Sequence, residues 1–345
     1  MPQRIAVDAM GGDEAPGAVV KGAARAARSA EGALELLLFG PEQQVSEALQ
    51  DCEEDASALP VRVVDAPEVI GMGEAPTEAV KQKPTSSIHR GLGACKEGRA
   101  DAFASAGNTG ALMAASLFIL GRLPGVDRPT MMSMVPTLEG QCLLMDVGTN
   151  VDCRPAHLVQ FARMGTVCAE RLEDCETPTV GLLNVGEEPG KGNEQTRKAY
   201  ELLEQQPSSS DLHFAGNVEG HDVLAHAADV VVCDGFIGNI ILKFGESIAT
   251  TLLREMVRRE IKRQDLSREQ AAAVQSVLDS VQEPFDYEAR GGVPLLGVDG
   301  TVLVGHGGSS PHAVERMIFA AADVAGESLP EAIAAAFEDA PDPAS

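Results

Sequence analysis

Residues 4–13 have the sequence Arg-Ile-Ala-Val-Asp-Ala-Met-Gly-Gly-Asp, a short apolar run followed at once by acidic residues and glycines. A buried strand that ends in a glycine turn has this pattern. Similar runs recur along the chain, and amphipathic helical runs separate them. This alternation is typical of βαβ units around a largely parallel sheet. Strands are predicted at 4–9, 34–39, 61–65, 102–106, 142–147, 180–185, 212–218 and 230–233, and helices at 16–29, 42–50, 85–96, 109–120, 157–172 and 193–206.

The pattern changes after Asp234. Two long, charged, amphipathic helices are predicted at 238–264 and 267–281, so residues 238–283 should form a helical hairpin that projects from the sheet. A β-hairpin should follow, because apolar runs flank Asp299-Gly300, a dipeptide suited to a type I′ turn.

The end of the chain also has an expected organisation. A helix at 311–325 should complete a single α/β domain that we assign to residues 1–330. Residues 331–345 should lie outside it, as a small alanine-rich helix that runs into a frayed acidic tail.

Charge and cysteine content exclude several functions. The chain has 27 basic and 52 acidic residues, a net charge of -25, whereas a nucleic-acid binder needs a broad basic face. We therefore expect no nucleic-acid partner. The seven cysteines are odd in number and never spaced as CxxC, which favours reduced thiols in the cytoplasm over disulfides or zinc.

The sequence suggests no export signal, because Asp8 interrupts the first apolar run. The most apolar stretch, 111–120, is shorter than the roughly 20 residues that span a bilayer. We therefore expect a cytoplasmic protein whose membrane contact is peripheral.

Polar and glycine-rich turns follow six of the predicted strands. Ligands of open α/β sheets bind at the carboxyl ends of the strands, and backbone N–H groups at a helix start can hold an anion. Any one such turn could merely connect a strand to a helix. The six turns lie at 8–13, 105–110, 146–150, 184–188, 216–220 and 234–239.

Familiar nucleotide and hydrolase motifs are absent from the sequence. No GxGxxG follows the first strand, and the segment 186–192 has the wrong glycine spacing for a Walker A loop. No GxSxG is present either, which disfavours a serine hydrolase. NAD and ATP lose support, and we expect no cofactor and no metal.

Several long strings of residues resemble the bacterial acyl-ACP:phosphate acyltransferases of phospholipid synthesis, and the resemblance covers residues 4–325. It implies a three-layer αβα fold with a largely parallel sheet, like that of the isocitrate and isopropylmalate dehydrogenases and of phosphotransacetylase. It also implies a homodimer that acts upstream of the membrane glycerol-phosphate acyltransferase. The strings lie at 5–13, 83–87, 105–111, 184–192, 216–220 and 232–236.

In such an enzyme, inorganic phosphate itself attacks the thioester of acyl carrier protein. The protein must bind the dianion, align it and stabilise the oxyanion. We expect Lys191 to bind phosphate or the oxyanion, and His306 to polarise the carbonyl or protonate the thiolate. A lysine in a glycine loop can equally be solvated, and a lone histidine is often structural. Asp234 and Asn239 complete the predicted catalytic set.

The remaining predicted site residues bind substrate or order the turns. Asp8 and Asp13 are unexpected beside an anion, so they should order the first loop or hold a lysine such as Lys83. Asn108 and Thr109 begin a helix and should donate hydrogen bonds to phosphate. The predicted substrate-binding residues are Asp8, Gly11, Gly12, Asp13, Lys83, Ser86, Ser87, Ser105, Gly107, Asn108, Thr109, Gly110, Asp146, Asn150, Asn184, Gly186, Glu187 and Asn217.

The acyl chain needs an apolar groove, for which Met10, Met72, Met113 and Leu117 are candidates, although apolar helix faces more often pack inward. The first long helix of the hairpin concentrates positive charge, which would attract an acidic carrier protein or an anionic membrane surface. A dimer helix with a solvated basic face explains the same pattern. Its basic residues are Arg254, Arg258, Arg259, Lys262 and Arg263.

Three other functions remain open. One is a phosphotransacetylase-like enzyme that acts on coenzyme A thioesters. Another is a non-catalytic scaffold that binds carrier protein at a membrane. A nicotinamide dehydrogenase of the same fold is the most distant.

Overall fold

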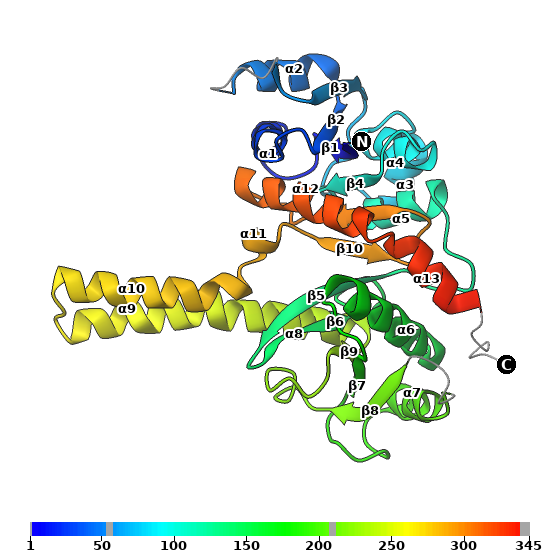
Figure 1. The fold of residues 1–345 in the computed structure, drawn as a ribbon, viewed down its shortest axis with the longest axis vertical. Helices are drawn as coiled ribbons and strands as arrows, with labels where there is room; N and C mark the ends of the chain where they lie inside the picture. The colour runs from blue at the N-terminus through cyan, green and yellow to red at the C-terminus, as the bar shows by residue number, and fades with distance from the viewer. Residues whose placement is uncertain (1, 53–57, 207–211, 339–345) are drawn as a thin grey trace.

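The computed structural model describes residues 2–52, 58–206 and 212–338, whose strands form one sheet (Figure 1). The strand order is β3-β2-β1-β4-β11-β10-β5-β6-β9-β7-β8. Figure 1 shows two halves, with β1–β4 and β10 above and β5–β9 below. The two halves join where β10 pairs with β5, at Leu295 with Met131 and at Leu296 with Thr130.

Three strands of the upper half, β1, β2 and β4, are buried on both faces, whereas β3 lies at the edge of the sheet and is partly exposed. Ile5 and Val7 belong to one apolar cluster and Ala6 to the other, and none of the three is exposed. Such double burial explains why these strands read as apolar runs without alternation. The parallel strands are β1 (Gln3–Asp8), β2 (Leu34–Gly40), β3 (Val61–Asp65) and β4 (Ala102–Ser105).

The lower half contains a second parallel set. Its strands are β6 (Gly140–Met145), β7 (Thr179–Leu183), β8 (His213–Val218) and β9 (Val230–Val232). All eight strands predicted from the sequence are thus confirmed, with ends that differ by up to two residues. The strand β5 (Thr130–Thr137) was not predicted, because methionines, a serine and a proline interrupt its β-branched pattern.

Helices cover both faces of the sheet, which confirms the predicted αβα class. The core accordingly divides into two apolar clusters. One face carries α1 (Gly17–Ser29), α2 (Glu42–Gln50), α6 (Pro155–Leu172), α7 (Glu194–Glu204), α12 (Pro311–Gly326) and α13 (Leu329–Glu338). The other face carries α3 (Pro76–Gln82), α4 (Ser87–Lys96) and α5 (Thr109–Ile119).

Two local predictions need correction. Residues 331–338 do not lie outside the domain, because Ile333 and Phe337 of α13 are buried in the core and α13 packs on α6. Residues 339–345 fall outside the described part of the chain. The predicted β-hairpin is present as β10 (Val293–Leu296) and β11 (Thr301–Val304), but its turn is not type I′. A four-residue loop, 297–300, connects the strands, and Asp299 lacks the positive φ that a type I′ turn requires.

The long helical hairpin projects to the left in Figure 1. Its first arm runs through α8 (Gly235–Ser247), a π-helical segment (Ile248–Leu253) and α9 (Arg254–Arg263). The second arm is α10 (Arg268–Gln282), and α11 (Tyr287–Arg290) leads back to β10.

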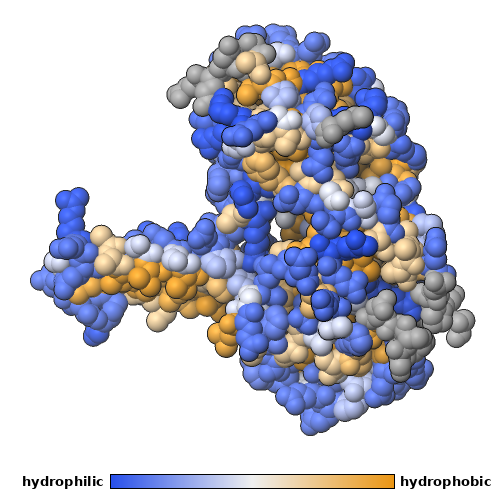
Figure 2. Space-filling model, viewed as in Figure 1, coloured by the Kyte–Doolittle hydropathy of each residue, from blue (hydrophilic) through white to orange (hydrophobic). Residues whose placement is uncertain are grey.

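The surface of the hairpin is partly apolar, as the orange band along it in Figure 2 shows. By length and composition alone, the helix Gly235–Arg263 could cross a membrane, and 11% of its most apolar window is buried. This helix is longer than the stretch 111–120 on which the expectation of peripheral membrane contact rests, so segment length alone does not support that expectation.

Candidate functional site

The turn after β1 packs tightly against the turns after β4 and β11. A Cβ atom on Gly11 would lie 2.8 Å from both Ser105 Oγ and Gly107 N, so the close approach requires glycine. The backbone N–H of Asp13 donates to Gly307 O at 2.7 Å. Three turns that the sequence placed at separate strand ends are therefore held together.

Asp8 organises this group of turns. Its Oδ2 accepts a hydrogen bond from Ser105 Oγ at 2.7 Å, and its Oδ1 accepts one from Met10 N at 3.1 Å. Burial raises the pKa of the Asp8 carboxyl, and hydrogen bonds from Ser87 and Ser105 oppose that rise. Asp8 therefore orders the first loop, which is one of the two roles predicted for it.

Lys83 does not pair with Asp8 or Asp13. Its Nζ contacts Glu74 Oε1 at 2.5 Å and Val69 O at 2.7 Å. The alternative role predicted for the two aspartates is therefore wrong.

Asn108 is a structural residue rather than a free donor for phosphate. Its Nδ2 donates to the carbonyls of Gly71, Met72 and Glu74, at 3.3, 3.0 and 3.1 Å. Its Oδ1 caps α5 by accepting from Ala111 N at 3.1 Å. With both amide atoms engaged, the predicted phosphate contact is not available without breaking these bonds.

A second organised turn follows β6. The Asp146 carboxylate is fully buried and accepts hydrogen bonds from Gly148 N, Thr149 N and Asn150 N at 2.8–2.9 Å. The Asn150 side chain adds a bond of 2.7 Å to the same carboxylate. Burial raises the pKa of Asp146, and these bonds oppose the rise. Asp146 and Asn150 therefore shape the turn and present its backbone.

The start of α8 docks on this turn. Asp234 caps α8 by accepting from Ile237 N at 2.9 Å, and Asn239 Nδ2 donates to Val147 O at 3.1 Å. Gly238 lies where a Cβ atom would be 1.9 Å from Asp146 O. The turn and the helix can therefore meet only through glycine at this position.

Lys191, Asn184 and Asn217 form a separate group at the β7–β8 edge of the sheet. Asn184 Nδ2 donates to Asn217 Oδ1 at 3.1 Å, and Asn217 Nδ2 donates to Glu188 O at 2.9 Å. Lys191 Nζ lies 3.6 Å from Glu188 Oε2, and half of its side chain is exposed.

A cavity of about 680 Å³ lies in the cleft between the two halves of the molecule. Thr109, Gly305 and His306 line it from the upper half, and Gly148 and Asn239 line it from the lower half. Most of the remaining wall is apolar. Representative apolar residues of that wall are Met131, Val135, Val223, Leu242, Phe244 and Val293.

The predicted site residues thus fall into three groups. Thr109, Asn239 and His306 line the cavity, whereas Lys191 and its neighbours do not. The third group supports the turns from behind. It consists of Asp8, Ser87, Ser105, Asn108, Asp146, Asn150 and Asp234, with Ser86 as the cap of α4 and Gly11, Gly12, Gly107 and Gly110 at close backbone contacts.

His306 has a defined tautomer when it is neutral. Gly308 N donates to its Nδ1 at 3.2 Å, so the neutral ring carries its proton on Nε2. An Nε2–H group on a residue of the cavity wall is suited to polarise a carbonyl by donating a hydrogen bond to its oxygen, and proton transfer to a leaving group would require the imidazolium form.

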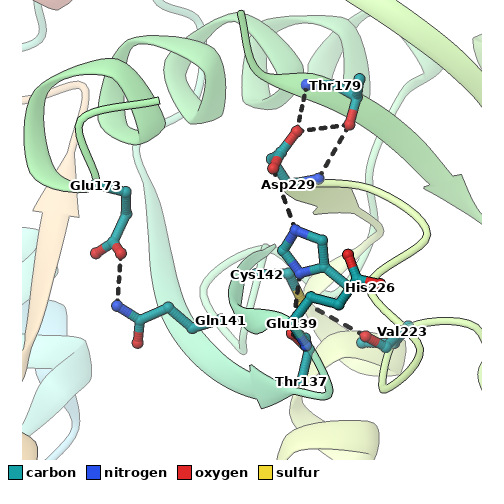
Figure 3. Close-up of polar contacts among 9 residues, drawn as sticks. All are labelled: Thr137, Glu139, Gln141, Cys142, Glu173, Thr179, Val223, His226 and Asp229. Atoms are coloured by element: carbon teal, nitrogen blue, oxygen red, sulfur yellow. Dashed lines mark hydrogen bonds and ion pairs between the residues drawn. The ribbon is translucent and has the colours of Figure 1, made fainter. Parts of the chain in front are cut away.

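A polar cluster that the sequence analysis missed holds one side of the cavity. Figure 3 shows His226 between Thr137 and Asp229, with distances of 2.9 Å from Nδ1 to Thr137 Oγ1 and 3.3 Å from Nε2 to Asp229 Oδ1. Asp229 Oδ2 also accepts from Thr179 N and Oγ1. The cluster ties the loop after β8 to the β5–β6 hairpin, and Val223 of this loop lines the cavity.

Comparison with known proteins places the chain in a family. A model of the family described as fatty acid synthesis protein matches residues 3–331. The chain belongs to the fatty acid synthesis protein family. A curated relative from Salinibacter ruber named phosphate acyltransferase is 56% identical, over 97% of this chain and 98% of that protein. A protein of the same name from Chlorobaculum parvum is 49% identical, over 96% and 98% of the two chains.

Solved structures confirm the fold of this family member. The EutD phosphotransacetylase from Staphylococcus aureus aligns with a TM-score of 0.60 and 15% identity, over 94% of both chains. A phosphotransacetylase from Streptococcus pyogenes gives the same TM-score with 20% identity, also over 94% of both chains. At this identity the likeness concerns the fold alone.

Cys153 and Cys233 contact the turn after β6, at Asn150 O and Asp146 O, and neither is an activated nucleophile. Burial, reinforced by Asp146 and Asp234, raises the pKa of Cys153 to about 12. Burial also raises the pKa of Cys233 well above its ordinary value. Thiolate is therefore scarce at neutral pH.

The contact between Gly238 and Asp146 can be tested with a matched pair of substitutions in α8. Gly238→Ala forces the helix away from the turn, because its Cβ would overlap Asp146 O, and should cost about 1–3 kcal/mol of stability together with most of the activity. Gly245→Ala faces open space on the same helix and should stabilise by about 0.5–1 kcal/mol. Urea unfolding and turnover measure both, and equal effects of the two variants would refute this packing.

Proposed function

We propose that this protein transfers a fatty acyl group from the thioester of acyl carrier protein to inorganic phosphate. The acyl phosphate would then serve phosphatidic acid and phospholipid synthesis. The observation that carries the proposal is the cavity, in which an extended apolar wall adjoins His306, Asn239 and Thr109. An apolar chain with one polar reactive end fits such a cavity.

The coarser part of this function does not depend on the cavity. The chain is an acyltransferase, because its full-length curated relatives are named phosphate acyltransferase. The identity of the acyl donor and the mechanism are our proposal.

The proposed reaction is a direct attack. A phosphate oxygen forms a bond to the carbonyl carbon, the carbon–sulfur bond breaks, and the departing thiolate takes a proton. The attacking hydrogenphosphate loses its own proton in this step, and that proton accounts for the one that the thiolate takes. His306 Nε2–H would stabilise the developing oxyanion; in the imidazolium form it would instead give the Nε2 proton to sulfur and recover a proton from the hydrogenphosphate. The high pKa values of Cys153 and Cys233 disfavour an acyl-enzyme at these two thiols.

The acyl chain would lie along β5 rather than against the residues predicted for it. Met131 and Pro136 both line the cavity, and five residue steps of strand span about 17 Å. Half of a bilayer core of about 30 Å, roughly 15 Å, is the reach of a long acyl chain. Met10, Met72, Met113 and Leu117 are not part of the cavity wall.

The hairpin would bring the substrates and partners to this cavity. We propose that the protein is a cytoplasmic homodimer with peripheral membrane contact, and that it passes its product to the membrane glycerol-phosphate acyltransferase. Large apolar side chains are exposed along the hairpin, Phe244 at 67% and Met256 at 58%. Acidic neighbours pair with Arg259 and Arg263, whereas the guanidinium of Arg254 bonds to Gln282.

A phosphotransacetylase-like enzyme that uses coenzyme A thioesters is the second candidate. Two phosphotransacetylases share its fold, which by itself does not distinguish between the two acyl donors.

One assay separates these functions. Palmitoyl carrier protein and phosphate should yield a product that hydroxylamine traps as the hydroxamate, and the yield should depend on phosphate. Turnover only with coenzyme A thioesters would support the second candidate, and no turnover would support a scaffold. Rapid mixing without phosphate should release no burst of carrier protein, and a stoichiometric burst would contradict direct attack.

His306→Asn should lower kcat by about 100-fold, because general acid–base catalysis typically contributes 10²–10⁴-fold. The melting temperature should change little. His312→Ala is the matched control, since its side chain is 59% exposed on α12. Equal kcat values for the two variants would remove His306 from the mechanism.

Charge reversal at Arg254, Arg258 and Arg259 should weaken binding to acyl carrier protein or to anionic vesicles, because it replaces attraction by repulsion. Turnover of small acyl thioesters should persist. Co-sedimentation and surface binding measure the two partners separately, and unchanged binding to both would eliminate this role of the hairpin.

A further inference from the structure

The cavity wall carries an excess positive charge on an acidic protein. Its lysine, arginine, aspartate and glutamate side chains, among the described residues, are Lys243, Glu246 and Arg290. Lys243 Nζ pairs with Glu246 Oε2 at 2.9 Å, so these two charges offset each other. Arg290 is left as the net cation of the wall, in a chain whose formal charge is -25.

Backbone packing holds Arg290 beside the end of β11, where His306 follows. Arg290 ends α11, and Gly291 and Gly292 connect it to β10. Gly291 has a φ of 79°, and a Cβ atom there would lie 2.1 Å from Met317 N. A Cβ atom on Gly305 would lie 3.4 Å from Gly291 O, so the segments that carry Arg290 and His306 are in contact.

The guanidinium of Arg290 is poorly compensated. It donates one hydrogen bond, from Nη2 to Pro284 O, and no carboxylate of the described residues lies within 4 Å of it. Burial lowers the pKa of Arg290, although the Glu246 charge opposes this effect. Glu173 opposes the effect in the same way. A half-buried cation whose neighbouring carboxylates lie beyond ion-pair distance is incompletely compensated, and an anionic ligand would relieve that cost.

We propose that Arg290 binds the phosphate dianion in the cavity whose wall His306 also lines. This inference deepens the proposed function and rests on it for the meaning of the bound phosphate. A planar guanidinium can donate two parallel hydrogen bonds to phosphate oxygens, which positions the anion as well as binding it. Arg290 thereby takes the role that the sequence analysis gave to Lys191, which lies outside the cavity wall.

The first test is Arg290→Gln. Hydrogen bonds to charged groups contribute about 1.5–3 kcal/mol, so KM for phosphate should rise by about tenfold to a hundredfold. KM for the acyl donor should change little. Arg290→Lys should give an intermediate KM for phosphate, because lysine keeps the positive charge but lacks the two parallel N–H donors of the guanidinium.

Two further variants sharpen the test. Glu246→Gln removes a negative charge from the cavity wall, which pairs with Lys243 and acts on Arg290 only at longer range, so KM for phosphate should fall. Arg316→Gln is the matched control, because Arg316 also bonds to a backbone carbonyl, Ala289 O at 3.0 Å, but does not line the cavity. It should leave KM for phosphate unchanged.

Binding without turnover separates this inference from the proposed function. Inorganic phosphate alone should raise the melting temperature of the native chain, and Arg290→Gln should abolish that shift. Loss of the shift supports phosphate binding by Arg290 even if the chain forms no acyl phosphate. The inference would be overturned if Arg290→Gln left both the phosphate-induced shift in melting temperature and KM for phosphate unchanged. It would also be overturned if the variant raised only KM for the acyl donor.

Discussion

The short junction between the halves of the sheet is the constraint on which the site depends. Two residue pairs, Leu295 with Met131 and Leu296 with Thr130, join β10 to β5. β5 continues to Thr137, and its later residues line the cavity instead of pairing with β10. The part of β5 that does not pair with β10 leaves an unpaired edge, and such an edge must be covered. Residues of α8 and of the loop after β8 lie opposite it and form the lower wall of the cavity.

Most of the polar residues at the strand ends serve this architecture indirectly. Asp8 and Asp146 are buried carboxylates, and a buried charge needs hydrogen bonds before it can be tolerated. Their bonds to serine hydroxyls and backbone N–H groups fix the turns after β1, β4 and β6. The turn that carries His306 and the start of α8, which carries Asn239, bond to these turns. Few of the predicted site residues therefore line the cavity, and many of the others hold the turns around it in place.

Charge in the cavity contrasts with charge on the rest of the molecule. An acidic protein repels phosphate at long range, so a local cation must compensate where the dianion binds. Arg290 has this position, in a wall that is otherwise mostly apolar. The attraction between a cation and an anion is stronger in apolar surroundings than in water. The half-exposed Lys191 therefore offers a weaker attraction to phosphate than Arg290 does.

The sequence by itself determined the αβα class, the positions of eight strands, the helical hairpin and the family. That these strands form two parallel sets of opposite direction was decided by the antiparallel pairing of β11, β10, β5 and β6. Apolar runs and glycine turns are local features of the sequence, so they predict strands and connections without knowledge of the tertiary structure. The family is identified in the same way, by long and unusual strings of residues. The roles of Asn108, Lys83 and Lys191, the turn at Asp299 and the course of β5 were decided by tertiary structure. Glycine and asparagine suit both ligand turns and plain connections, so the distances across the cleft determine which of them face a substrate. The sequence around Arg290 does not predict a phosphate site. The positive charge of the cavity wall is left uncompensated at Arg290 only because Lys243 and Glu246 pair with each other in the folded chain.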